Sequence, residues 1–259
     1  MQPILISSCD KYLDIAYVSA LSLLKYSPIL KSRISFICEG HEVNSGKIKR
    51  IEDLGFNVIK TGLSTWPEIL ENALNLYKEN SHIILLLDDF LIKSAVNVDC
   101  LNELCNFAEE NDYDYLRLIP RPNNFKKNSD TKELKNRNII IKNIEINSRF
   151  SINLQASIWK KNFLKNILKE INNPWELEIF ASSKMNQDLK IACTSDDIFN
   201  YKHHSLEKGL WFPWELKRVK LLFPDFYNQR EILSFQKLII WYFSILKGFI
   251  AFKLDNLKL

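Results

Sequence analysis

One short segment constrains this chain more than any other. Five consecutive apolar residues, 83–87, run directly into Asp88 and Asp89, and the sequence then becomes apolar again at Phe90. A short apolar run of this kind predicts a strand covered on both faces, as in the middle of a parallel sheet. Two adjacent carboxylates at its end repel each other and are penalised by desolvation, so they require a cation, hydrogen-bond donors or solvent beside them.

The acidic pair has two explanations. Ligands of open α/β sheets bind at the carboxyl ends of the strands, and a hard divalent cation prefers oxygen ligands, with phosphate oxygens of a substrate supplying the others. The alternative is local, because Asp also follows core strands as a helix cap or in a solvated turn. The pair alone does not separate a ligand site from a turn.

Bulk properties narrow the class of protein. The 259 residues suffice for one large α/β domain or two small ones. The formal charge of +4 is mild, and the basic residues are scattered without base-stacking aromatics between them, which argues against nucleic-acid binding. Five widely spaced cysteines predict reduced core thiols of a cytoplasmic protein and no zinc site. The first six residues do not resemble a signal peptide.

Strand and helix patterns alternate over the first 120 residues. Strands are expected at 4–7, 33–38, 56–60, 83–87 and 113–119, and helices at 13–26, 45–54, 65–77 and 98–109. Thr65 and Glu68 form a capping box at one helix start, with Pro67 in the first turn. This alternation predicts a doubly wound α/β fold with a mostly parallel sheet.

The pattern changes after Pro120. Residues 121–137 form a polar excursion, whereas 149–158 alternate between apolar side chains and an uncharged polar set. That alternation predicts a half-buried strand whose polar face suits sugar hydroxyls or plain solvent. Two helices, at 161–169 and from 173, a strand at 190–194 and a loop at 201–214 follow.

The C-terminal segment, residues 232–254, is apolar and aromatic with Lys237, Lys247 and Lys253 interspersed. Its uninterrupted apolar run is too short to span a bilayer. The pattern fits a helix in a membrane interface, and it equally fits a buried terminal helix or an oligomer contact. We therefore expect a main domain at 1–225 and an amphipathic helical tail at 226–259.

The order of these features resembles the GT-A glycosyltransferase fold over roughly residues 3–215. Residues 6–12 look like the nucleotide-binding turn of that family, and Leu87-Asp88-Asp89 looks like a variant of its Asp-x-Asp motif. The spaced motif itself is absent, because Leu87 stands two residues before Asp89. The resemblance implies an α/β, Rossmann-type, mostly parallel central sheet flanked by helices, with a C-terminal helical extension.

The resemblance also implies a donor site. The residues that would contact the nucleotide-sugar donor are Ser8, Asp10, Tyr12 and Asp88. Asp89, with Asp88 and His204, would hold a divalent cation, Mn²⁺ or Mg²⁺, which stabilises the charge of a departing diphosphate. Two local alternatives remain: Asp10 caps the following helix, and His203 with His204 is an ordinary packed or solvent-facing pair.

An inverting transfer needs a general base for the acceptor hydroxyl. Trp175-Glu176-Leu177-Glu178 resembles the acidic helix start that supplies this base in inverting GT-A enzymes, with Glu176 slightly preferred over Glu178. Alternatively, both residues stabilise the helix. Asn173 and Glu176 also form a capping pair, and carboxylates in the first turn interact favourably with the helix dipole. The acceptor-side candidates are Arg117, Asn153, Gln155 and Trp175.

These features predict a cytoplasmic enzyme, peripheral on the inner face of the cytoplasmic membrane, that makes surface polysaccharide such as capsule or lipopolysaccharide. It would move a sugar from a nucleotide-sugar donor to a glycan or lipid-linked acceptor. A nucleotidyltransferase is the rival enzyme, and the missing Gly-rich phosphate loop near residue 8 argues against it. A non-catalytic sugar-binding or assembly subunit, docked through the apolar tail, is the rival from another class.

Overall fold

The computed structural model of the chain describes residues 2–125, 131–134, 139–146, 148–183, 188–201 and 205–257, without the side chains of 179–183, 249 and 251–257. The chain forms two compact units, Met1–Tyr201 and Lys202–Leu259. The sequence placed the start of the tail later, at residue 226.

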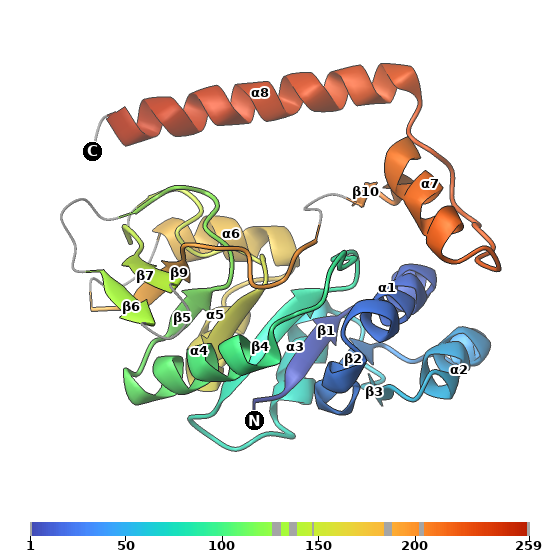
Figure 1. The fold of residues 1–259 in the computed structure, drawn as a ribbon, viewed down its shortest axis with the longest axis horizontal. Coiled ribbons are helices and arrows are strands. Elements are labelled where there is room, and N and C mark those ends of the chain that lie inside the picture. Colours follow the sequence, from blue (N-terminus) through green and yellow to red (C-terminus); the bar gives the residue numbers. More distant parts are fainter. Residues whose placement is uncertain are drawn as a thin grey trace. The chain divides into compact units, whose positions relative to one another are not determined.

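The first unit is built on one sheet, which has nine strands in the described residues, in the order β3-β2-β1-β4-β8-β5-β9-β7-β6 (Figure 1). The strands are β1 Ile4–Ser7, β2 Ile34–Cys38, β3 Asn57–Lys60, β4 His82–Leu87, β5 Tyr115–Arg117, β6 Lys132–Leu134, β7 Ile139–Asn143, β8 Ser157–Lys160 and β9 Ile191–Thr194. Strands β1 to β4 are parallel to one another, β8 lies antiparallel between β4 and β5, and β7 lies antiparallel to its two neighbours. The predicted fold class, a mostly parallel central sheet flanked by helices, is confirmed.

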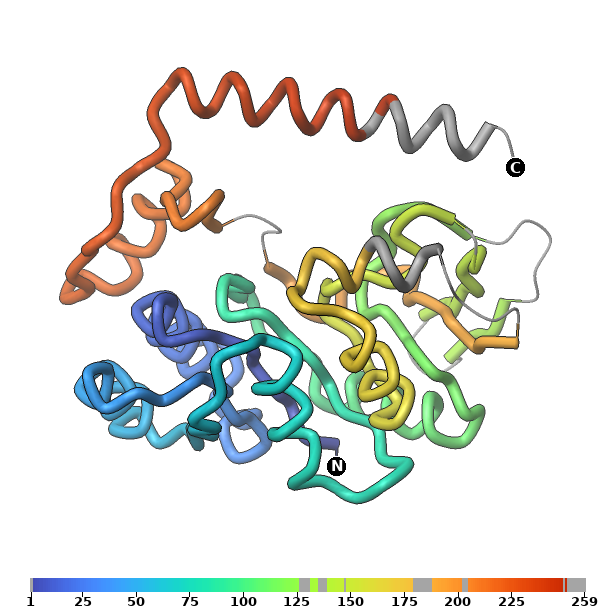
Figure 2. Tube along the Cα trace, turned by 180° about the vertical axis from the view of Figure 1, so that it is seen from behind, coloured from blue at the N-terminus to red at the C-terminus, as the bar shows by residue number. Residues whose placement is uncertain are grey.

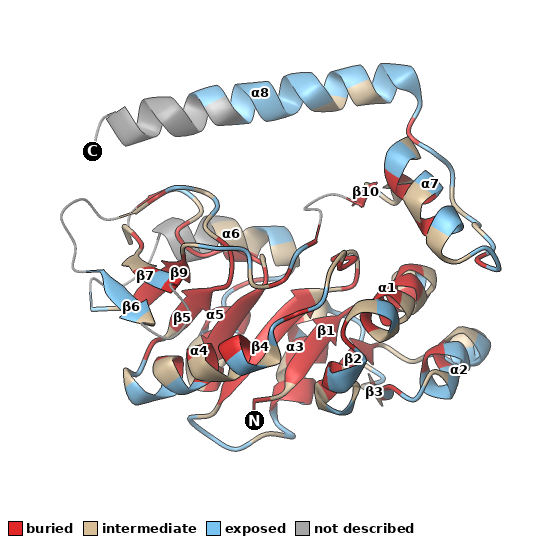
Figure 3. Cartoon of the chain, in the orientation of Figure 1, coloured by how far each residue is buried: buried red, intermediate tan, exposed pale blue. Residues whose placement is uncertain are grey.

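Helices cover both faces of this sheet. They are α1 Leu13–Tyr26, α2 Ser45–Asp53, α3 Trp66–Leu74, α4 Val98–Glu110, α5 Lys161–Leu168 and α6 Pro174–Ser183, with 3-10 turns at Asp10–Tyr12, Pro28–Arg33 and Glu42–Asn44. Ile4 and Ile6 point into a core layer shared with α1, α2 and α4, whereas Leu5 points into a layer shared with α3, α5 and α6. Figure 2 shows α3, α5 and α6 on the face that is turned away in Figure 1. The central strands are therefore buried on both sides, which explains their continuous apolar sequences (Figure 3).

The order of the strands creates a switch point beside β1. The chain proceeds from β1 through β2 to β3 on one side, and then crosses to place β4 on the other side of β1. Ser7 pairs with both Ile37 of β2 and Leu87 of β4, so Ser8 and Asp88 follow at the same edge of the sheet. Such an edge is where open α/β sheets bind ligands.

The strand predicted for residues 149–158 is wrong over most of that range. Only Ser157 and Ile158 lie in a strand, at the start of β8, and the residues before them form turns and bends. Polar side chains there bond to nearby backbone: Ser157 Oγ donates to the Gln155 carbonyl, and Asn153 Oδ1 accepts from the Gln155 N–H. This local bonding competes with pairing to a neighbouring strand.

The second unit contains a short hairpin and two helices. These elements are β10 Leu206–Glu207, β11 Leu210–Trp211, α7 Pro213–Leu222 and α8 Phe235–Leu257. The hairpin turns at Lys208 and Gly209, whose positive φ angles of 50° and 81° suit a tight two-residue connection. The predicted C-terminal helical extension is confirmed as α8, whereas the hairpin and α7 occupy a region that the sequence analysis assigned in part to a loop. No helix in the described part of the chain combines the length and hydropathy needed to cross a membrane.

Candidate active site

The acidic pair and the first-strand loop meet at the switch point. The Ser8 hydroxyl donates to Asp88 Oδ2 at 2.6 Å, and both residues are buried. The Ser8 N–H also bonds to the Ile37 carbonyl at the end of β2. Ser8 and Asp88 were both predicted to contact the donor, and they are in contact although they lie eighty positions apart in the sequence.

Asp89 has a different environment from Asp88. It is only partly exposed, and its carboxyl group accepts a hydrogen bond from its own backbone N–H. Burial raises its pKa to about 7, and no described side chain forms an ion pair with it. A buried carboxyl group with a raised pKa at the end of a central strand is a candidate functional group. A bound cation would supply the positive charge that its surroundings lack.

A metal site at this position fits the chemistry of Asp88 and Asp89, both of which offer hard oxygen ligands. Among the residues that the structure describes, no group of three or more His, Cys, Asp or Glu side chains is placed to hold a metal ion. His204 lies outside the described residues, so its metal role stays a prediction.

Asp10 is held by the loop that follows β2. Its carboxylate accepts hydrogen bonds from the Gly40 and His41 N–H groups at 2.8 and 2.9 Å, and from the side chains of His41 and Asn44. Burial by itself would raise the pKa of Asp10, but these hydrogen bonds outweigh it and lower the pKa. Asp10 therefore braces residues 40–44 beside the switch point, and it does not cap the following helix α1, whose N-cap residue is Tyr12 and which has no side-chain cap hydrogen bond. Tyr12 ends the 3-10 turn that begins at Asp10, with its N–H bonded to the Cys9 carbonyl.

Tyr201 is the residue that the sequence analysis missed. Its ring stacks on Phe90, directly after the acidic pair, with 4.2 Å between ring centroids. Its hydroxyl donates to Gln155 Oε1 at 2.8 Å and accepts from the Ala156 N–H at 3.0 Å. Tyr201 thus joins the acidic loop to the segment that carries Gln155. The sequence around Tyr201 did not indicate these contacts, apart from its place immediately before residues 202–204.

Glu178 reaches the same segment from α6. Its Oε1 accepts from the Leu154 N–H at 3.2 Å, and burial raises its pKa. Leu154 precedes Gln155, so contacts run without a break from Asp89 and Phe90 through Tyr201 to Glu178. A carboxyl group with a raised pKa in such a cluster is suited to proton transfer.

Glu176 forms hydrogen bonds that cap the start of α6. Its N–H donates to Asn173 Oδ1, and Asn173 Nδ2 donates back to its carboxylate at 2.6 Å. The Asn172 N–H also donates to it and lowers its pKa. The capping pair that the sequence offered as the alternative role of Glu176 is therefore present.

The four acceptor-side candidates lie in different places. Gln155 belongs to the cluster around Tyr201. Arg117 is fully buried, and its guanidinium donates to the Pro122 carbonyl and to Asn124, so it holds a loop together. Asn153 is also buried and accepts from the Tyr115 hydroxyl, whereas the Trp175 side chain is 76% exposed on α6.

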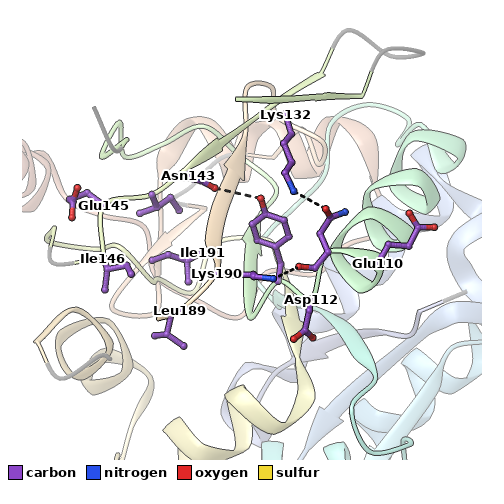
Figure 4. A pocket seen from close by; sticks show the side chains of 12 residues that line it. Glu110, Asp112, Lys132, Asn143, Glu145, Ile146, Leu189, Lys190 and Ile191 are labelled. Carbon is purple, nitrogen blue, oxygen red and sulfur yellow. Dashed lines mark hydrogen bonds between the residues drawn. The ribbon is translucent and has the colours of Figure 1, made fainter. Parts of the chain in front are cut away.

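A separate pocket of about 570 Å³ lies at the other edge of the sheet (Figure 4). Its lining includes Tyr113 and Lys190, which precede β5 and β9. The acidic pair instead follows the end of β4. Because β4 and β5 run in the same direction, the pocket and the acidic pair lie at opposite ends of the strands. Its polar groups bond to each other, as with Lys132 and Lys190, which both donate to Asn111. This pocket is therefore distinct from the acidic cluster.

Comparisons with known proteins give structural neighbours only. No protein-family model matches the chain, and neither does any curated protein sequence. A cytidylyltransferase from Leptospira borgpetersenii is 13% identical, with a TM-score of 0.44, and the match covers 90% of this chain and 98% of that one. S. aureus TarS in complex with UDP-GlcNAc is 14% identical, with a TM-score of 0.47, over 86% of this chain and 65% of that one. The galactosyltransferase LgtC, in complex with donor and acceptor sugar analogues, is 14% identical, with a TM-score of 0.41, over 72% and 68% of the two chains.

Proposed function

We propose that this chain is a glycosyltransferase that moves a sugar from a nucleotide-sugar donor to a hydroxyl group of a glycan acceptor, with inversion. The observation that carries the proposal is the cluster at the switch point. Asp88 is bonded to Ser8, Asp89 has a pKa raised to about 7, and Tyr201 links this acidic loop to Gln155. The proposed role in surface polysaccharide synthesis rests on the sequence resemblance.

The donor side of the proposal uses the acidic pair. Asp89, with Asp88, would hold a divalent cation, which when bound stabilises the negative charge that develops on a departing diphosphate. Ser8 orients Asp88 through its 2.6 Å hydrogen bond. Asp10 fixes the loop at 40–44, which would form one wall of the donor site.

The acceptor side uses Glu178. In an inverting transfer the acceptor oxygen forms a bond to the anomeric carbon, the bond from that carbon to the diphosphate breaks, and the hydroxyl proton passes to a base. Glu178 suits that base because burial raises its pKa, whereas Glu176 is occupied by the cap of α6. Gln155, whose side chain accepts a hydrogen bond from Tyr201, would contact the acceptor.

The two glutamates provide the test and its matched control. Glu178→Gln should abolish sugar transfer and leave nucleotide-sugar affinity unchanged, because the amide cannot accept the proton. Glu176→Gln makes the same change two residues away and should retain turnover. The measurements are release of nucleoside diphosphate in the presence of Mn²⁺, over a panel of nucleotide sugars and glycan acceptors, and donor binding by calorimetry.

Equal activity of the two variants would remove Glu178 as the base. Release of pyrophosphate from a nucleoside triphosphate and a sugar phosphate would instead identify a nucleotidyltransferase. A chain that binds nucleotide sugars without releasing any product would be a binding subunit.

A further inference from the structure

The exposed apolar side chains of this chain are concentrated in its C-terminal unit. In the described residues, seventeen large hydrophobic side chains are exposed, and twelve of these lie between Trp214 and Ile250. Exposed apolar side chains that gather in one part of a protein mark a site of interaction with another molecule.

Helix α8 carries most of this surface. All of its residues from 235 to 248 are exposed except Leu238 and Trp241, which are partly buried (Figure 3). At about 100° per residue, one set of its exposed apolar side chains falls within an arc of about 100° along the helix. This set, the apolar stripe, consists of Phe235, Ile239, Tyr242, Phe243, Leu246 and Ile250.

The rest of the α8 surface is mixed. Lys237 and Ser244 fall opposite the apolar stripe by the same geometry, Gln236 and Lys247 fall at its border, and both lysines are exposed. The exposed Ile240 and Ile245 fall outside the stripe, one on each flank. Aromatic and aliphatic side chains with interspersed lysines suit a helix that lies in the plane of a membrane surface, where the long lysine side chains reach the headgroups.

Aromatic contacts hold α8 to the rest of its unit. Trp241 packs on Phe212, at the start of α7, with ring centroids 4.8 Å apart, and Phe212 stacks on Trp214 at 4.9 Å. Trp241 lies outside the apolar stripe, so this anchor leaves the stripe exposed. Tyr227, which is 77% exposed, and Trp214 add amphipathic rings of the kind found at membrane interfaces.

Charge decides between the two molecules that this surface could contact, a second copy of the chain and a membrane. Residues 202–259 contain ten Lys and Arg against five Asp and Glu, a net charge of +5, whereas residues 1–201 contain twenty-five against twenty-six, a net charge of −1. The whole positive excess of the chain therefore lies in the unit with the exposed stripe. Two copies of this unit would repel each other, whereas an anionic surface would attract it.

We propose that α8 binds an anionic phospholipid surface, with the apolar stripe inserted between headgroups and Lys237 and Lys247 among the anionic phosphates. The inference does not depend on the proposed sugar transfer, because it rests on the second unit alone.

The test uses the full chain and vesicle flotation. Vesicles of phosphatidylcholine alone are compared with vesicles of phosphatidylcholine and phosphatidylglycerol in equal parts. The chain should float with the mixed vesicles and bind the neutral vesicles more weakly, and added salt should reduce the difference. Lys237→Gln with Lys247→Gln should weaken binding to the mixed vesicles by roughly fivefold for each lysine.

Phe243→Glu with Leu246→Glu should abolish binding to both kinds of vesicle. These side chains are 61% and 52% exposed, so the variant keeps its fold, which circular dichroism checks. Val43→Glu with Leu76→Glu makes the same chemical change at two sites of the first unit that are 90% and 67% exposed, and it should bind as the unmodified chain does. The proposal is overturned if the Phe243 and Leu246 variant still floats, or if the unmodified chain does not. It is equally overturned if light scattering shows a dimer that this variant dissociates while neither protein binds vesicles.

Discussion

At the scale of single residues, the ionised form of Asp89 destabilises the metal-free fold. Its pKa is raised to about 7 by burial, whereas an Asp in an unfolded chain ionises near pH 4. The fold therefore loses stability as the pH rises from about 4 to about 7, and the whole penalty is present above that range.

Asp89→Asn should consequently stabilise the metal-free fold by on the order of 1–3 kcal/mol above about pH 7, and should have no effect below about pH 4. Mn²⁺ should reverse the order, because it stabilises the unmodified chain and not the variant. Urea denaturation at the two pH values, with and without Mn²⁺, measures both effects. A variant that Mn²⁺ stabilises as strongly as the unmodified chain would exclude Asp89 as a ligand.

Asp10 is the opposite kind of acid, because hydrogen bonds from the loop after β2 lower its pKa. Asp10→Asn should destabilise the fold by about 1–3 kcal/mol at neutral pH, since an amide cannot accept from Gly40, His41 and Asn44 together. The stabilisation by Asp10 is present above about pH 4 and is lost as the pH falls through the folded-state pKa, so the difference should shrink in acid. Asp53→Asn, at an exposed site that ends α2, should change stability by less than about 0.5 kcal/mol.

The roles of single residues were predictable only where burial was evident in the sequence. The acidic pair stood out because it ends a continuous apolar run. The sequence slightly favoured Glu176 over Glu178 as the base, whereas the structure shows Glu176 bonded to Asn173 and Glu178 bonded to the Leu154 N–H. Tyr201 gave no signal, because its partners Phe90 and Gln155 are far away along the chain.

At the scale of elements, the turn after β2 depends on a glycine. Gly40 has a φ of 81°, and an added Cβ would lie 2.6 Å from Lys60 Cβ in β3. Gly40→Ala should therefore destabilise the fold by about 1–3 kcal/mol and loosen the loop that Asp10 holds. Gly62, at a φ of 70° with open space around it, is the matched control, and Gly62→Ala should cost about 1 kcal/mol. Thermal unfolding of both variants measures the difference, and an equal loss would show that crowding against Lys60 is unimportant.

The elements of the first half were predictable because their strands are buried on both faces, so their apolar runs are continuous. Residues 149–158 misled the prediction, since their alternation reflects buried polar side chains that bond to local backbone. Helix α7 did carry a signal, with Pro213 at its start and Glu215 in its first turn.

At the scale of the whole molecule, the proposed donor residues and the proposed lipid-binding surface belong to different units. A chain that ends at Ser234 lacks α8 and should keep its nucleotide-sugar affinity, because Ser8, Asp88 and Asp89 all lie in the first unit. Calorimetry with the donor identified in the transfer assay measures this. Loss of donor affinity in a truncated chain that remains folded would show that α8 contributes to the donor site.

Tyr201, which braces the acidic loop, is also the last residue of the first unit. The covalent chain therefore leaves the proposed active site at a residue that belongs to it, and residues 202–259 are tethered at that point. An acceptor embedded in the same lipid layer as that tether would be met at a high effective concentration, set by chain length rather than by the bulk solution.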